Sequence, residues 1–113
     1  MRILIVDQEF LVAMEVERVL AEAFACEIQI ATPRNYPVEL ERREFDVVVI
    51  DSTLIDGKGE AARRLRAAGA GLVFTTLGEE DMAGMDGWAG VPVVAKPFND
   101  HHLVEAVRNA ARI

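Results

Sequence analysis

At 113 residues, of which 51% are hydrophobic and 27% charged, the chain is long enough for one folded domain and too short for two. Its net charge of −7 argues against nonspecific binding to nucleic acid or to an anionic membrane, and its apolar runs are too short to span a bilayer. The single cysteine, Cys26, excludes a disulfide framework and a cysteine-based metal site, so we expect a cytoplasmic protein in which Cys26 is a small buried residue.

The first part of the chain alternates between strand and helix patterns. Residues 2–6 form a short apolar run, which predicts a strand that ends at Asp7. From residue 8 to residue 24, apolar side chains recur at helical spacing and predict an amphipathic helix. Residues 26–31 alternate as in a strand at a sheet edge, and the turn residues that follow lead into a short helix over residues 37–43.

The central stretch, residues 45–51, carries an uninterrupted run of Val and Ile that ends in the carboxylate of Asp51. Such a run is typical of a strand buried on both faces inside a parallel sheet. The segment 57–68 is rich in Ala, Leu and Arg, and it predicts a helix that stops at Gly69.

The last part of the chain predicts two more strands and two more helices. Residues 72–76 predict a strand, and residues 79–89 predict a short or mobile helix. A fifth strand over 91–95 contains Pro92, which suits an edge position. Asn99 is a suitable N-cap for the final helix. Five alternations of strand and helix predict one α/β domain over residues 1–113, with a parallel sheet covered by helices on both faces.

Four polar residues follow or end four of these strands: Asp7, Asp51, Thr76 and Lys96, here called the strand-end cluster. Each alone has an ordinary explanation as a helix cap, a turn former, a strand terminator or a solvated charge. Carboxyl ends of parallel strands meet at one edge of the sheet, however, where ligands bind in open α/β folds. Two carboxylates can hold Mg²⁺, and with an ammonium and a hydroxyl they form a receptor for a phosphoryl group in which Asp51 is the best-placed nucleophile.

Five short motifs, each generic by itself, occur in the order and at the spacing of one protein family. They are Ile-Leu-Ile-Val-Asp7, Asp-Val-Val-Val-Ile-Asp51, Asp56-Gly57, Phe74-Thr-Thr76 and Ala95-Lys-Pro-Phe98. Together they resemble the receiver domain of response regulators in two-component signalling, and the likeness covers all 113 residues. The resemblance implies a flavodoxin-like, doubly wound sheet of five parallel strands in the order 2-1-3-4-5.

The resemblance also implies a role for each site residue. Asp51 matches the phosphoacceptor, Thr76 the hydroxyl that follows the phosphoryl group, and Lys96 the lysine of the site. Asp7 matches the first member of an acidic pair that holds Mg²⁺ together with Asp51, and the main-chain carbonyl of Thr53 matches the backbone ligand of the metal.

Three positions depart from the family's pattern. Gln8 replaces the second acid of the pair and brings no charge, so we expect weaker Mg²⁺ binding unless the loop lets Glu9 compensate. Ile55 stands where a proline is common. Val93 occupies the position of the aromatic switch residue, so output would have to move through backbone shifts in residues 79–90.

These observations predict a single-domain response regulator that takes a phosphoryl group from a histidine kinase or a histidine phosphotransferase. Without an output domain, it would bind a downstream protein through residues 79–113 or act as a phosphate sink, and its only catalysis would be its own phosphorylation and dephosphorylation. One alternative is a degenerate receiver that binds proteins without phosphorylation. A Mg²⁺-dependent phosphatase of the haloacid-dehalogenase type is less favoured, because Thr53 stands where that family has a second aspartate.

Two further groups of residues permit two interpretations each. The apolar side chains of the segment before the fifth strand form either an adaptable partner surface or a packed core face: Met82, Met85 and Trp88. The arginines of the 57–68 helix form either a solvated face or a strip that steers an acidic partner: Arg63, Arg64 and Arg66.

Overall fold

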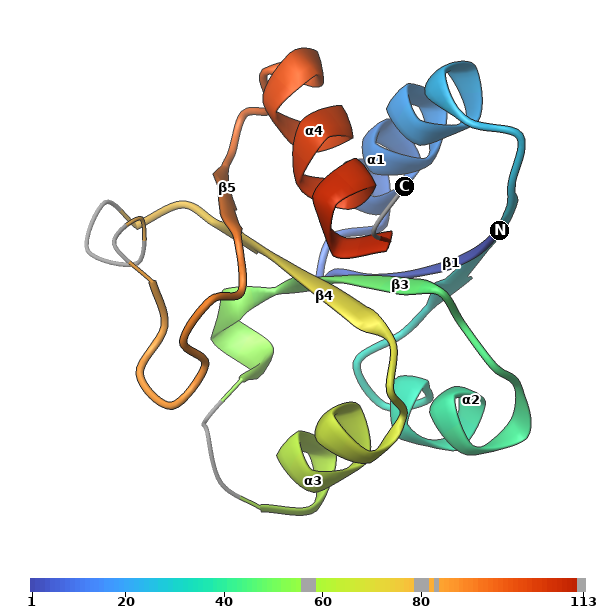
Figure 1. Ribbon diagram of the computed structural model, residues 1–113, viewed down its shortest axis with the longest axis vertical. Helices are drawn as coiled ribbons and strands as arrows, with labels where there is room; N and C mark the ends of the chain where they lie inside the picture. Colours follow the sequence, from blue (N-terminus) through green and yellow to red (C-terminus); the bar gives the residue numbers. More distant parts are fainter. Residues whose placement is uncertain (56–58, 79–81, 83, 112–113) are drawn as a thin grey trace.

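The computed structural model describes residues 1–55, 59–78, 82 and 84–111 as one parallel sheet covered by helices (Figure 1). The strands are β1 (Arg2–Val6), β2 (Glu27–Ala31), β3 (Val47–Asp51), β4 (Gly71–Thr76) and β5 (Val93–Ala95). The helices are α1 (Phe10–Ala23), α2 (Tyr36–Arg42), α3 (Gly59–Ala67) and α4 (Asp100–Ala111), with a 3-10 turn, η1, at Ser52–Leu54. All strand pairs are parallel and the order is β2-β1-β3-β4-β5, which confirms the predicted topology.

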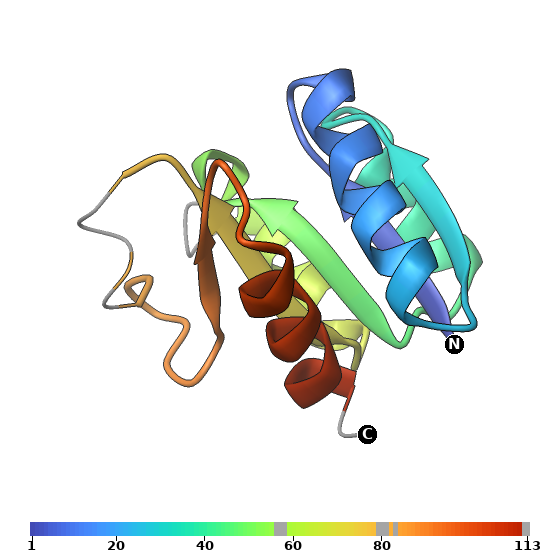
Figure 2. The same ribbon diagram turned by 90° about the horizontal axis from the view of Figure 1, so that it is seen from above.

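The sheet separates two hydrophobic cores. Helices α1 and α4 cover one face, and α2 and α3 cover the other (Figures 1 and 2). Because side chains alternate along a strand, Ile3 and Ile5 of β1 pack with α1 and α4, while Leu4 and Val6 pack on the opposite face. Each face of the sheet is thus closed by a pair of helices.

The positions of the strands in the sheet follow their sequence patterns. Every residue of β3 is buried, and β3 pairs with β1 on one side and β4 on the other, as the unbroken apolar run predicted. Strands β2 and β5 lie at the two edges, also as predicted. Pro92 immediately precedes β5, and its carbonyl accepts a hydrogen bond of 2.9 Å from Phe74 N.

Helix ends agree with the local sequence signals. The Asn99 side chain accepts a hydrogen bond of 3.1 Å from His102 N, which confirms Asn99 as the N-cap of α4. Gly69 has a φ of 72° two residues after α3 ends, a left-handed conformation that terminates helices. Among the described residues, no helix has the length and apolarity needed to cross a membrane.

The connection between β4 and β5 differs from the prediction of a helix over residues 79–89. Residues 79–81 and 83 lie outside the described residues, and residues 84–90 consist of turns and irregular backbone. Gly84, Gly87 and Gly90 have φ values of 115°, 82° and 83°, which a right-handed helix does not accommodate. The glycines therefore prevent the described part of this segment from continuing as a helix.

Candidate functional site

Three of the four residues of the strand-end cluster are in direct contact at the carboxyl edge of the sheet. Asp7 follows β1, Asp51 ends β3, and Lys96 follows β5. Lys96 Nζ donates a hydrogen bond of 2.7 Å to Asp7 Oδ2 and lies 3.2 Å from Asp51 Oδ2. The structure thus brings together residues from three strands, at sequence separations of up to 89 residues.

Asp7, Asp51 and Lys96 form a buried group of charged side chains, here called the charged unit. The side chains of Lys96, Asp7 and Asp51 are 9%, 4% and 10% exposed. Buried charges are costly unless they are paired, and one ammonium shared by two carboxylates leaves the unit with one net negative charge. Lys96 N also donates to Thr76 O at 2.8 Å, which fixes the lysine backbone beside the end of β4.

The remaining carboxylate oxygens bind the turns that follow each strand. Asp7 Oδ1 accepts from Glu9 N at 2.9 Å. Asp51 Oδ1 accepts from Thr53 N and from Thr53 Oγ1, both at 3.0 Å. The two aspartates therefore act as turn formers and as members of the charged unit at once, because each carboxylate divides its oxygens between the two roles.

Gln8 is linked to Asp51 through the side chain of Thr53. Its Nε2 donates to Thr53 Oγ1 at 2.5 Å, and the Thr53 hydroxyl in turn donates to Asp51 Oδ1. The sequence argument gave Thr53 a role only through its main-chain carbonyl, and the side-chain link was missed. A threonine two residues after an aspartate at a strand end is a signal for such a turn.

Thr76 is 3% exposed at the end of β4. Asp51 pairs in register with Thr75, so Thr76 lies one residue beyond the level of Asp51 on the neighbouring strand. The Thr76 hydroxyl accepts a hydrogen bond of 2.9 Å from Gly78 N. This hydroxyl therefore ties the end of β4 to the loop that follows it.

The donor set suits a weakly held divalent cation. Mg²⁺ prefers oxygen ligands and keeps several waters, so Asp7, Asp51 and the Thr53 carbonyl would suffice to hold it. No group of three His, Cys, Asp or Glu gathers anywhere in the described ranges. Lys96 and the turn donors already bind all four carboxylate oxygens, so a cation would have to compete with them.

The other residues singled out in the sequence lie outside this charged unit. Glu9 is exposed, and it precedes α1 at the N-cap position. Val93 begins β5 and pairs with Phe74. Trp88 and Met85 pack against the core on the α3 side, which favours packing over a partner surface for these two, whereas Met82 is 47% exposed.

The three arginines do not form one solvated face. Arg63 is exposed and pairs with Glu60, as expected of a solvated residue. The partly buried Arg64 lies 3.2 Å from Glu41 and 3.3 Å from Glu60. Arg66 lies over the ring of Trp88. The solvated-face interpretation is confirmed for the exposed Arg63 and Arg66 and is wrong for the partly buried Arg64, whose contact with Glu41 of α2 cannot be inferred from helical spacing.

The fold and the strand-end cluster define a doubly wound α/β protein with the receiver-domain fold. Similar solved structures include a putative response regulator from Chloroflexus aurantiacus, with 24% identity, TM-score 0.79 and coverage of 99% of this chain and 98% of that one. The response regulatory domain of mrkE from Klebsiella pneumoniae has 17% identity, TM-score 0.78 and coverage of 99% and 96%. The chemotaxis response regulator CheY4 of Vibrio cholerae has 18% identity, TM-score 0.74 and coverage of 96% and 97%. No protein-family model and no curated protein sequence matches the chain.

Proposed function

We propose that this chain is a phosphoryl-accepting switch in which Asp51 receives the phosphoryl group of a histidine kinase or a histidine phosphotransferase. The observation that carries the proposal is the position of Lys96 Nζ, 2.7 Å from Asp7 and 3.2 Å from Asp51 at the carboxyl edge of a receiver-type sheet. A buried ammonium beside two carboxylates supplies the positive charge that phosphoryl transfer requires.

In the proposed reaction, a carboxylate oxygen of Asp51 attacks the phosphorus of the donor phosphohistidine. A P–O bond forms while the P–N bond breaks, and the donor imidazole keeps the electron pair and takes up a proton. Lys96 offsets the charge on the phosphoryl oxygens, and the Thr76 hydroxyl donates to one of them after leaving Gly78. When bound by Asp7, Asp51, the Thr53 carbonyl and the weak ligand Gln8, Mg²⁺ supplies additional positive charge. Water attack on the acyl phosphate later restores Asp51.

As a receiver domain in the cytoplasm, the chain would pass the signal on by binding another protein or by draining phosphoryl groups from a shared kinase. Residues 79–113 are the proposed contact region for a downstream target. The chain would act on itself only, through its phosphorylation and the hydrolysis that resets it.

A second candidate function is a degenerate receiver that binds proteins without phosphorylation. The specific observation in its favour is that the chain's own donors bind all four oxygens of Asp7 and Asp51. Gln8 also presents an amide N–H group, rather than an acceptor oxygen, to Thr53. A charged unit whose carboxylate oxygens all have partners without a cation can serve as a purely structural element.

One experiment separates the two functions. The protein is incubated with Mg²⁺ and acetyl phosphate, or with beryllofluoride, and the adduct is detected by intact mass spectrometry or by ¹⁹F NMR. Asp51→Asn is the site control, and Asp46→Asn is the matched control, since exposed Asp46 binds Arg2 N at the opposite end of β3. If no Asp51-dependent adduct forms at high Mg²⁺ and no histidine kinase phosphorylates the protein, the switch is refuted.

A further inference from the structure

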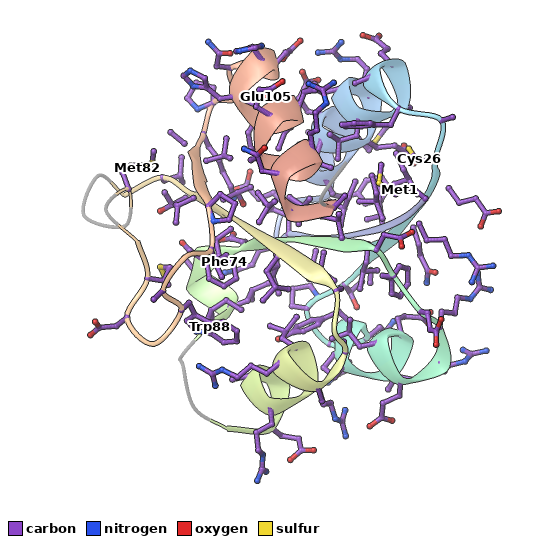
Figure 3. All side chains as sticks on the ribbon, viewed as in Figure 1. Met1, Cys26, Phe74, Met82, Trp88 and Glu105 are labelled. Atoms are coloured by element: carbon purple, nitrogen blue, oxygen red, sulfur yellow. The ribbon has the colours of Figure 1, made fainter. Side chains whose placement is uncertain are left out.

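Trp88, the chain's only tryptophan, is held in the core by an aromatic neighbour from β4. Its side chain is 5% exposed although it comes from the irregular connection between β4 and β5. The ring lies edge-on to Phe74, with 5.5 Å between centroids and 86° between planes. Figure 3 shows the two side chains next to each other, on the α3 side of the sheet.

A charged residue from a different element also contacts Trp88. The guanidinium carbon of Arg66, in α3, lies 4.0 Å from the Trp88 ring centroid. Arg66 Nη2 also donates a hydrogen bond of 2.9 Å to the carbonyl of Gly87, the residue before Trp88. Phe74, Trp88 and Arg66 therefore form an aromatic clamp that ties the β4–β5 connection to β4 and to α3 at once.

Strand β4 connects the aromatic clamp to the strand-end cluster. Phe74 and Thr76 are two residues apart, so their side chains leave the same face of the sheet. Phe74 also pairs in register with Val93, the position where the receiver family's pattern has an aromatic residue. A displacement of Thr76 at the end of β4 would therefore act on the ring that supports Trp88.

The buried position of Trp88 carries a cost that makes its release feasible. Within the described part of the chain, the indole Nε1 is buried and has no hydrogen-bond partner. An unsatisfied buried donor opposes burial, because water would bind it in the exposed state. The unpaired indole N–H thus offsets part of the stability that the clamp gains by burying Trp88.

We infer that the aromatic clamp is the readout of the phosphoacceptor site. In the unmodified chain, Arg66 and Phe74 hold Trp88 and its connection against the sheet. Modification of Asp51 draws Thr76 toward the phosphoryl group, shifts the end of β4 and releases Trp88 to water. This coupling rests on the proposed phosphoryl-accepting function, and Trp88 takes the role that Val93 cannot fill.

The test is a beryllofluoride titration in the presence of Mg²⁺, followed by the emission of Trp88, with adduct formation measured in parallel by ¹⁹F NMR. The emission should move to longer wavelength as the Asp51 adduct forms, and Asp51→Asn should show no change. Arg66→Gln weakens the clamp, so the variant should reach half-saturation at about two- to fivefold lower beryllofluoride, the factor that corresponds to one cation–π contact. The matched control is Arg63→Gln on the same helix, which should titrate like the unmodified sequence.

The outcomes separate this inference from the proposed function. If the Asp51 adduct forms but Trp88 emission stays constant, the coupling is wrong and the phosphoryl-accepting function stands. Equal half-saturation of Arg66→Gln and Arg63→Gln would likewise overturn the role of the clamp. If no adduct forms and no histidine kinase phosphorylates the protein, both proposals fail together.

Discussion

Replacing Lys96 with methionine should lower the free energy of unfolding by about 3–5 kcal/mol, the usual cost of removing one partner from a buried ion pair. The structure explains why the upper part of the range applies. Asp7 and Asp51 have side chains only 4% and 10% exposed, so water cannot replace the missing ammonium. Since small domains unfold at a cost of about 5–15 kcal/mol, the variant would lose a large part of its stability.

The assay is urea unfolding followed by far-ultraviolet circular dichroism at neutral pH. Arg63→Met is the control, because its ion pair with Glu60 joins side chains that are 74% and 61% exposed, and such pairs contribute ~1 kcal/mol or less. Equal losses in Lys96→Met and Arg63→Met at neutral pH would refute the buried-charge argument.

Three further predictions concern single positions. Gln8→Asp should tighten Mg²⁺ binding by about tenfold or more, since it adds a charged ligand; unchanged affinity in calorimetry would show that residue 8 does not contact the metal. Gly71→Ala should lower the free energy of unfolding by about 1–3 kcal/mol, and with it the urea midpoint, because the added Cβ would lie 2.1 Å from the Ala110 carbonyl oxygen. An unchanged midpoint would contradict this close packing. Burial raises the pKa of the Cys26 thiol, so alkylation by iodoacetamide near pH 8 should be slower than for a free cysteine and should accelerate as pH rises; a rate equal to that of the unfolded protein would contradict it.

The sheet topology and most of the site were predictable from the sequence, because both follow from strands of strong and simple pattern. The β-branched run of β3 and the apolar run of β1 each end in an aspartate. Once the strands are parallel, their ends must meet, and Lys96 is then within reach of Asp7 despite a sequence separation of 89. No local signal was needed for that contact.

The β4–β5 connection was not predictable to the same degree, because its structure depends on tertiary contacts. Its Met, Trp and Gly residues fit a short helix, a partner surface or irregular backbone equally well. The conformation of the connection depends on Trp88, which packs against Phe74 and Arg66. Arg66 belongs to α3 and lies 22 residues earlier in the chain. The side-chain link from Gln8 to Thr53 was missed for a similar reason, because it joins two loops that only the fold brings together.

The residue at position 8 should affect both the stability of the metal-free protein and its affinity for Mg²⁺. With Asp7, Asp51 and Lys96 alone, the buried unit has one net negative charge and is stable through its own hydrogen bonds. A third carboxylate at residue 8 would raise the repulsion and make the unit depend on a cation. We therefore expect the Gln8→Asp variant to unfold more easily than the parent without Mg²⁺ and to gain more stability than the parent when Mg²⁺ is added. If Gln8→Asp lost no stability in chelator, the repulsion argument would fail, whatever its Mg²⁺ affinity.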